Sequence, residues 1–236
     1  MVSSYVFRKE DKFMEVQFVE SKNLKEKPTG ALGFGKYYTD YMFVMDWDAG
    51  QEWHDARVVP YGPLEFDPAS MVLHYAQETF EGMKAYTTEK GQIVVFRPDL
   101  NAERMVNSAK RLEMPPFPQD RFVDAVKQVV KANEGYVPPY GSGATLYIRP
   151  YMFGSDAVIG VKPANEYQFR IFCTPVGPYF KGGAKPITIR VSDYDRAAPN
   201  GTGHIKAGLN YAMSLHAIVE AHEQGYAENM YLDSAT

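Results

Sequence analysis

Short runs rich in β-branched and aromatic residues, bounded by polar or glycine-containing turns, recur along this chain and predict strands. The runs at 41–47 and 57–61 flank the turn Asp48-Ala49-Gly50, so they are expected to form a hairpin. The runs at 83–87 and 92–96 predict a second hairpin in the same way. Further strands are expected over 145–153, 167–175, 186–191 and 229–233. Residues 1–30 are charged and are expected to form an arm with at most one strand, near 14–19.

Helical spacing is clearest over 121–133, where apolar residues recur on one face. These residues are Phe122, Ala125, Val126, Val129 and Val130. Another helix is expected over 101–112. Asp67-Pro68 has the composition of a helix start, which predicts a helix over 69–80 that ends at Gly82. The last expected helix covers 210–224.

A stretch rich in glycine and proline at 177–183 is the best candidate for a joint between domains. It divides the chain into a small N-terminal α/β domain with its arm, 1–176, and a second part, 184–236. After the joint only a strand, a helix and part of a strand remain, and one such unit cannot cover both faces of a sheet. We therefore predict a two-domain α/β protein of the α+β type, whose second domain is either unusually small or incomplete.

Composition excludes several classes of protein. The 236 residues carry 25 Lys and Arg against 29 Asp and Glu, a formal charge of −4, which argues against nucleic-acid binding. Apolar runs such as Ile93-Val94-Val95-Phe96 are too short to cross a bilayer, and no secretory signal is visible. The single Cys173 fits a reducing compartment, so a cytoplasmic location is expected.

The most informative loop runs from Arg196 through Asn200-Gly201-Thr202-Gly203-His204 to Lys206, with Tyr211 five residues later. A lysine among small residues can act as a nucleophile toward a carbonyl when its surroundings favour the neutral amine. The local pattern alone fits an exposed loop lysine before an ordinary helix better. A phosphate-binding loop is rejected, because the glycine spacing differs and no Ser or Thr follows the lysine.

Three arginines are further candidates. Arg97 and Arg104 are either solvated residues of a helix or, if one points inward, a clamp for a phosphate group. Tyr147 and Arg149 alternate along a predicted strand and therefore share one face. That face is either a carboxylate-binding wall or the wet side of an edge strand.

Other chemistries have weak support. The five histidines lack metal-ligand spacing, so no metal site is expected. They are His54, His74, His204, His216 and His222. The acidic pairs Glu78/Glu81 and Asp193/Asp195 are of a kind that helix and turn surfaces show routinely.

Several motifs occur in one order and together resemble a known family. They are Gly33-Phe34-Gly35-Lys36-Tyr37, Phe80-Glu81-Gly82-Met83-Lys84-Ala85-Tyr86, Phe96-Arg97-Pro98-Asp99-Leu100-Asn101 with Arg104-Met105, Leu146-Tyr147-Ile148-Arg149-Pro150, and Lys206-Ala207-Gly208-Leu209-Asn210-Tyr211. From about Phe34 to its last residue the chain resembles the branched-chain amino-acid aminotransferases. These are pyridoxal-phosphate enzymes with the D-amino-acid aminotransferase-like fold, fold type IV.

The resemblance implies roles for particular residues. Lys206 would form the Schiff base with pyridoxal phosphate and then move the substrate proton. Tyr211 would hydrogen-bond the ring's phenolic oxygen, and Arg104 would hold the phosphate, which leaves Arg97 a structural residue. The implied substrate pocket for Leu, Ile and Val side chains consists of Phe34, Tyr75, Phe80, Tyr147 and Tyr179. Arg149 would receive the second carboxylate of glutamate or 2-oxoglutarate, and a homodimer is implied.

The chain also departs from this family, whose members continue well past 231–236. The continuation would hold the glutamate that pairs with the pyridine nitrogen, the rest of the phosphate site, and the loop for the substrate α-carboxylate. We therefore expect this chain to be an incomplete, inactive part of a branched-chain transaminase. Two alternatives remain: another fold-type IV enzyme, such as a D-amino-acid aminotransferase or aminodeoxychorismate lyase, or a non-catalytic fragment that binds the cofactor weakly.

Overall fold

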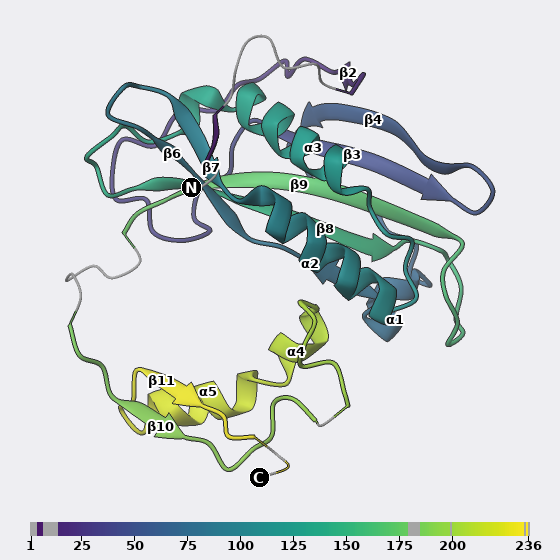
Figure 1. Ribbon diagram of the computed structural model, residues 1–236, viewed down its shortest axis with the longest axis vertical. Coiled ribbons are helices and arrows are strands. Elements are labelled where there is room, and N and C mark those ends of the chain that lie inside the picture. Colours follow the sequence, from purple (N-terminus) through teal and green to yellow (C-terminus); the bar gives the residue numbers. More distant parts are fainter. Residues whose placement is uncertain (1–3, 7–13, 179–184, 199, 234, 236) are drawn as a thin grey trace. The chain divides into compact units, whose positions relative to one another are not determined.

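A computed structural model describes the chain except for residues 1–3, 7–13, 179–184, 199, 234 and 236 (Figure 1). The chain consists of two units, Met1–Tyr179 and Phe180–Thr236. Most of the predicted joint, 179–183, lies outside the described residues. Among the described residues, no helix has both the length and the apolar character that a bilayer span requires.

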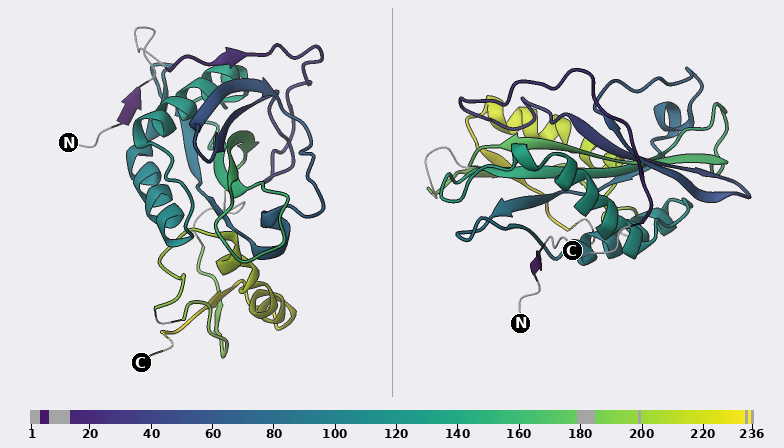
Figure 2. Two further views of the ribbon diagram at one scale, coloured as in Figure 1. Left: turned by 90° about the vertical axis from the view of Figure 1, so that its right-hand side faces the viewer. Right: turned by 90° about the horizontal axis from the view of Figure 1, so that it is seen from above.

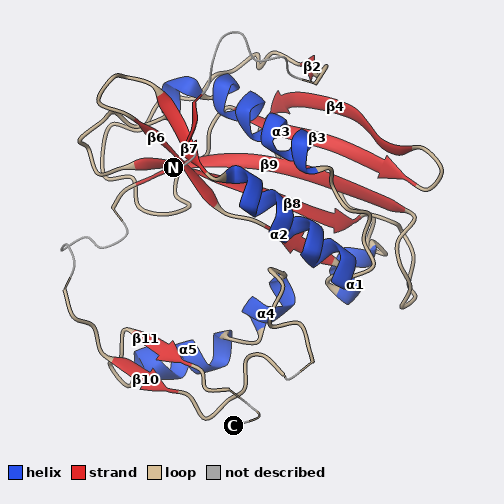
Figure 3. Ribbon diagram, in the orientation of Figure 1, coloured by secondary structure: helices blue, strands red, loops and turns tan. Residues whose placement is uncertain are grey.

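The first unit is built on a nine-stranded sheet (Figure 3). Its strand order is β1-β7-β6-β8-β9-β3-β4-β2, and β5 also pairs with β8. The strands are β1 (Ser4–Val6), β2 (Gln17–Phe18), β3 (Tyr41–Asp48), β4 (Glu52–Pro60), β5 (Glu78–Phe80), β6 (Met83–Thr87), β7 (Ile93–Phe96), β8 (Thr145–Gly154) and β9 (Glu166–Val176).

Both predicted hairpins are confirmed, since β3 pairs antiparallel with β4 and β6 with β7. Strand β4 starts five residues earlier than expected, directly after a turn in which Gly50 has a φ of 91°. The arm contributes two strands, not one at most, because β1 and β2 pair through their backbones with the outer strands β7 and β4. Such edge pairing needs little apolar patterning, so the sequence signal was weak.

The predicted helix over 69–80 is wrong beyond its first turns. Helix α1 spans only Met71–Tyr75, and Ala76 follows with a left-handed φ of 49° that ends it. Residues 78–80 form β5, which pairs with Tyr151–Phe153 of β8. Pairing with an existing strand satisfies the backbone groups of this segment, and tertiary structure thereby overrides the helical pattern.

Two long helices, α2 (Pro98–Arg111) and α3 (Gln119–Ala132), cover one face of this sheet (Figure 2). Both confirm predicted helices with slightly earlier starts. All five residues of the expected apolar face of α3 are buried, as the helical spacing predicted. A short 3₁₀ turn, Glu134–Tyr136, follows α3.

The centre of the core lies between these helices and the sheet. The ring of Phe169 on β9 stacks on Phe117 with centroids 3.8 Å apart and meets the rings of Phe43, Trp53 and Phe122. Cys173 of the same strand is fully buried, and burial raises the pKa of its thiol well above the usual range, so it packs as an apolar side chain.

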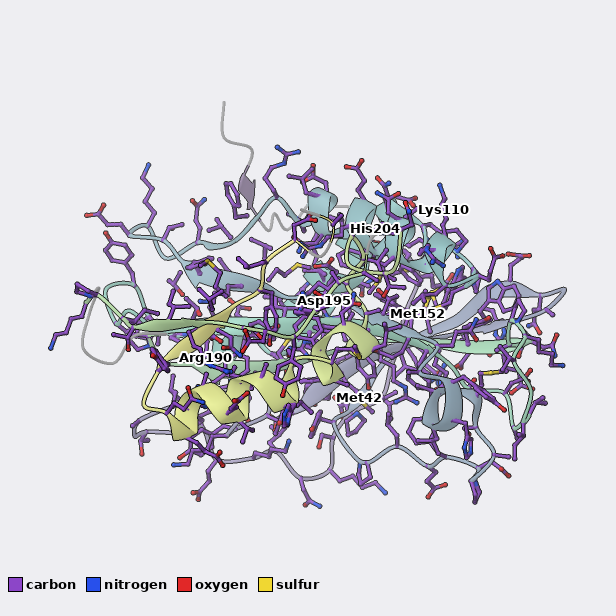
Figure 4. The ribbon with its side chains drawn as sticks, turned by 90° about the horizontal axis from the view of Figure 1, so that it is seen from below. Met42, Lys110, Met152, Arg190, Asp195 and His204 are labelled. Carbon is purple, nitrogen blue, oxygen red and sulfur yellow. The ribbon has the colours of Figure 1, made fainter. Side chains whose placement is uncertain are left out.

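The opposite face of the sheet follows from the two-residue period of its central strands. Along β8, Leu146, Ile148 and Met152 enter the core, so Tyr147, Arg149 and Tyr151 face the other way. In Figure 4, Lys110 of α2 and Met42 of β3 lie on opposite sides of the sheet. Strand β8 pairs with β5, β6 and β9, which excludes the edge-strand alternative for Tyr147 and Arg149.

The second unit contains two parallel strands, β10 (Ile189–Val191) and β11 (Glu228–Met230), joined through two helices. The helices are α4 (Gly208–Ala212) and α5 (Leu215–Glu223), where one helix over 210–224 was expected. The helix is interrupted because the Ser214 backbone N–H and hydroxyl both donate to the Tyr211 carbonyl. Arg190 of β10 fastens α5 through paired hydrogen bonds of 2.9 and 3.1 Å to Glu220.

We predict that Phe169→Ala lowers the free energy of unfolding of the first unit by about 3–5 kcal/mol, because it empties the centre of the core. Urea unfolding followed by tryptophan fluorescence measures this, since both tryptophans, Trp47 and Trp53, lie in the first unit. The matched control is Phe96→Ala, whose ring is 58% exposed and which should change the value by at most about 0.5 kcal/mol. Equal effects of the two substitutions would contradict this account of the core.

Candidate active site

The predicted lysine and tyrosine meet in the second unit. Lys206 lies between buried Ile205 and Ala207, and its Nζ donates a 2.6 Å hydrogen bond to the Tyr211 Oη. The Nζ is 4.9 Å from the centroid of the Tyr211 ring, and the Arg196 guanidinium is 5.2 Å from the same centroid. The Lys206 amine, the Tyr211 hydroxyl and the Arg196 guanidinium therefore lie close together at the start of α4. Lys206 is thus not an isolated loop residue.

Asn210 holds the loop in front of this pair and was missed by the sequence analysis. Its side chain is almost fully buried, and its Nδ2 donates to the carbonyls of Thr202 at 2.7 Å and Ile205 at 3.0 Å. Its Oδ1 accepts from the Thr202 hydroxyl at 2.8 Å. The signal available in the sequence was an asparagine one position before the candidate tyrosine, in the first turn of an expected helix. Figure 4 labels His204 in the same loop.

Arg104 of α2 and Glu81 form an ion pair in the first unit. The Arg104 Nε and Nη2 donate to the two carboxylate oxygens of Glu81 at 2.6 and 2.8 Å. The Glu81 side chain is fully buried, so its assignment to an exposed acidic pair was wrong. Glu81 lies between β5 and β6, where the sequence analysis expected the end of a helix. The signal available in the sequence was the charged Glu81 between Phe80 and Gly82-Met83. Arg97 pairs instead with Asp99, at 2.7 Å.

Four of the predicted pocket residues lie together on the face of the sheet opposite α2 and α3. The Arg149 Nη2 donates to the Tyr147 Oη at 2.9 Å, and its guanidinium is 4.6 Å from the centroid of Phe80. The Phe34 ring meets the Tyr147 ring edge-on, with centroids 5.2 Å apart. Aromatic faces and one cation therefore form a continuous wall.

Gly82 fits against this wall because it has no side chain. A Cβ at this position would stand 2.3 Å from the Tyr147 Oη and 3.0 Å from its Cζ. Gly82, Asn101 and Tyr147 also line a cavity of about 370 Å³ together with Met83, Lys84, Tyr86 and Phe96. The short connection between β5 and β6 thus contains both the buried Glu81 and the Gly82 that leaves room for the Tyr147 hydroxyl of β8.

Two predicted pocket residues are not part of this group. Tyr75, at the end of α1, lines a different cavity with Gln77 and Arg111. Tyr179 lies outside the described residues. The described residues contain no group of three or more His, Cys, Asp or Glu side chains placed to hold a metal ion.

Burial changes the ionisation of the groups next to the wall. Desolvation raises the pKa of the Tyr151 hydroxyl and lowers the pKa of the Arg170 guanidinium, which lies opposite Tyr151 in the pairing of β8 and β9. The Arg170 Nη2 donates to the Gln168 Oε1 at 2.8 Å. The Tyr151 hydroxyl and the Arg170 guanidinium are therefore partly withdrawn from water beside the wall.

The fold and these residues define a class of protein. The family model of Amino-transferase class IV matches residues 78–236, and this chain belongs to that family. The predicted resemblance to the aminotransferases and the predicted fold type IV are thereby confirmed.

The curated proteins that are similar to this chain include branched-chain-amino-acid aminotransferases. The chain is 46% identical over 203 residues to a branched-chain-amino-acid aminotransferase of Mycolicibacterium smegmatis, with 86% of this chain and 55% of that protein aligned. It is 48% identical over 218 residues to one of Haemophilus influenzae, with 90% and 63% aligned. The chain thus spans little more than half the length of the curated relatives it matches.

The structure is also similar to solved structures of branched-chain amino acid aminotransferases. The branched-chain amino acid aminotransferase from Escherichia coli is 29% identical with a TM-score of 0.60, over 83% of this chain and 58% of that one. The branched-chain aminotransferase from the archaeon Thermoproteus uzoniensis, solved with norvaline, is 27% identical with a TM-score of 0.63, over 82% and 60% of the two chains. Another branched-chain amino acid aminotransferase of similar likeness was solved in complex with N-(5'-phosphopyridoxyl)-L-glutamate.

We predict that Gly82→Ala displaces the Tyr147 ring and breaks its hydrogen bond with Arg149, because the added methyl group overlaps the hydroxyl. A crystal structure of the variant measures the shift directly. Gly62→Ala is the matched control, since an added Cβ there meets no atom within 4 Å. An unmoved Tyr147 in the variant would contradict the close packing.

We predict that Asn210→Ala loosens residues 202–206, because the partly buried Thr202 carbonyl and the buried Ile205 carbonyl lose their donor. Hydrogen–deuterium exchange of the backbone amides in this loop should accelerate by about tenfold, the equivalent of about 1.4 kcal/mol of local stability. Gln224→Ala at the end of α5 serves as the control and should leave the exchange of 202–206 unchanged. Unaltered protection in Asn210→Ala would show that other contacts hold the loop.

Proposed function

We propose that the whole protein is a branched-chain-amino-acid transaminase, which transfers amino groups between Leu, Ile or Val and 2-oxoglutarate with pyridoxal 5'-phosphate as cofactor. The observation that carries this proposal is the 2.6 Å contact between Lys206 and Tyr211, in a chain of class IV aminotransferase sequence. The names of the curated relatives support the choice of substrates over those of D-amino-acid aminotransferases and lyases.

The side chains fit the proposed cofactor chemically. Pyridoxal phosphate carries an aldehyde and a phenolic oxygen on neighbouring ring carbons, and Lys206 and Tyr211 present an amine and a hydroxyl that are also in contact. Its phosphate matches the fork of N–H donors of a guanidinium, which Arg104 supplies in this proposal. When bound, the cofactor withdraws electrons from the substrate Cα, so that bonds at this carbon can break.

Lys206 has two tasks in this proposal. Its Nζ would hold the cofactor covalently in the resting protein, and as a free amine it would move the proton at the substrate Cα. A side chain that moves a proton has to stay close to one position. The buried neighbours Ile205 and Ala207 and the loop held by Asn210 provide that restraint. Tyr211 hydrogen-bonds the ring oxygen.

The aromatic wall accounts for two kinds of substrate. Phe34, Phe80 and Tyr147 offer apolar surface to Leu, Ile and Val side chains. Arg149, held beside the Tyr147 hydroxyl, pairs with the second carboxylate of glutamate or 2-oxoglutarate, which would otherwise be costly to bury. We include Tyr75 and Tyr179 in the pocket on the strength of the sequence resemblance alone. A homodimer in the cytoplasm belongs to the same proposal, and light scattering on the purified protein tests the dimer.

The experiment that tests the function joins a labelling reaction to an assay. The protein is mixed with pyridoxal phosphate, its visible absorbance is recorded, and borohydride is added before peptide mass mapping. Amino transfer is then followed for L-Leu, L-Ile, L-Val and their D-isomers with 2-oxoglutarate. Transfer from D-isomers alone would favour a D-amino-acid aminotransferase, and a label without transfer would favour a fragment that only binds the cofactor.

We predict that Lys206→Ala abolishes the borohydride-stable label, because Lys206 supplies the amine that lies against Tyr211. The variant should retain the overall fold, since Lys206 is only partly buried. Lys185→Ala removes an exposed lysine of the same unit and should leave the label in place. A label of unchanged yield on Lys206→Ala would overturn the assignment.

A further inference from the structure

Glu81 is a carboxylate with no exposed surface, in the connection between β5 and β6. Taking a charge out of water is expensive unless ionic partners and hydrogen bonds replace the water. A charged residue at such a position therefore serves either the stability of the fold or the orientation of its partners.

The side-chain partners of the Glu81 carboxylate described here come from one face of α2. Arg104 donates two hydrogen bonds, at 2.6 and 2.8 Å, and the Asn101 Nδ2 donates a third at 2.7 Å. Asn101 and Arg104 are three residues apart on the helix and so lie side by side. The Gly82 N–H adds a longer contact of 3.3 Å to the same carboxylate.

The pair is asymmetric in its exposure. The side chain of Arg104 is 51% exposed, whereas that of Glu81 is 0% exposed. Stability alone does not demand such a pair, since apolar residues of similar volume commonly serve as well. The pair does fix the orientation of Arg104. Two hydrogen bonds in one plane hold this long, half-exposed side chain, which otherwise has many rotamers.

We propose that Glu81 is a positioning residue that orients Arg104 for the phosphate group of the cofactor. This inference rests on the proposed function, in which Arg104 binds that phosphate. A guanidinium carries five N–H donors in one plane, and Glu81 uses two of them. The plane of the remaining donors is then set before the anion arrives, which removes an ordering cost from binding.

The direction in which Glu81→Gln changes the affinity for pyridoxal phosphate separates a positioning role of Glu81 from an effect of its charge alone. Glu81 is an anion close to a proposed anion site, so its negative charge by itself weakens phosphate binding. If charge were its only influence, Glu81→Gln would tighten the binding of pyridoxal phosphate. Positioning predicts the opposite, because the glutamine amide cannot accept both Arg104 bonds and the guanidinium turns away.

The experiment compares pyridoxal phosphate with pyridoxal, which lacks the phosphate group. Dissociation constants of both compounds are measured by fluorescence titration of the purified full chain and of each variant. Glu81→Gln should weaken the binding of pyridoxal phosphate by about tenfold, comparable to the loss of one charge-assisted hydrogen bond between Arg104 and the phosphate. The binding of pyridoxal should change less than twofold. Glu81→Asp, which keeps the charge but draws the guanidinium back, should cause a loss in the same direction.

Two controls make the result specific. Glu103→Gln is the same substitution at an exposed position next to Arg104 and should leave both constants unchanged. Urea unfolding followed by tryptophan fluorescence reports the stability of each variant. A loss of stability with an unchanged preference for pyridoxal phosphate would assign Glu81 a purely structural role and overturn the proposal, as would tighter binding by Glu81→Gln. If Glu81→Gln does not fold, Glu81→Asp decides by the same criterion.

Arg104→Lys distinguishes this inference from the proposed function. It should lower the preference for pyridoxal phosphate over pyridoxal if Arg104 holds the phosphate. An unchanged preference in Arg104→Lys, or equal affinities of the unsubstituted protein for both compounds, would refute the phosphate role of Arg104 and with it the inference. A lowered preference in Arg104→Lys combined with an unchanged one in Glu81→Gln would refute the positioning role alone.

Discussion

The alternation of side chains along β8 is the constraint on which the first unit depends. Leu146, Ile148 and Met152 enter the core beneath α2 and α3, and this places Tyr147 and Arg149 on the opposite face. A register shift of one residue would exchange the two sets and bury a guanidinium in the core. Because β5, β6 and β9 all pair with β8, this single register sets both the packing of the core and the composition of the aromatic wall.

The connection between β5 and β6 joins that wall to α2. Glu81 binds Arg104 and Asn101 of the helix, and the next residue, Gly82, leaves room for the Tyr147 hydroxyl. Two neighbouring residues therefore carry opposite requirements: one has to bear a charge, and the other has to have no side chain. In the second unit, Asn210 similarly holds the loop that ends in Lys206. In both units a buried polar side chain holds the backbone or side chain that presents a cation.

Predictions from local pattern succeeded where neighbouring residues decide the conformation. The apolar face of α3 and the two hairpins around short polar turns have this origin, since helical spacing and turn residues act over a few positions. The pattern failed over 69–80, where pairing with β8 converts an expected helix into β5. That failure also hid Glu81, which would be exposed on a helix at this position but is buried in the strand connection.

The sequence by itself determined the family, the spacing of Lys206 and Tyr211, and the shared face of Tyr147 and Arg149, because motifs and the two-residue period of a strand are local properties. Only the tertiary structure decided that β8 is a central strand, that Glu81 is buried against Arg104, and that Tyr75 lines a different cavity from Tyr147. The physical reason is that burial and ion pairing depend on elements far apart in the chain. Residue 81 meets residue 104 only after a strand and a helix have both packed against the same sheet.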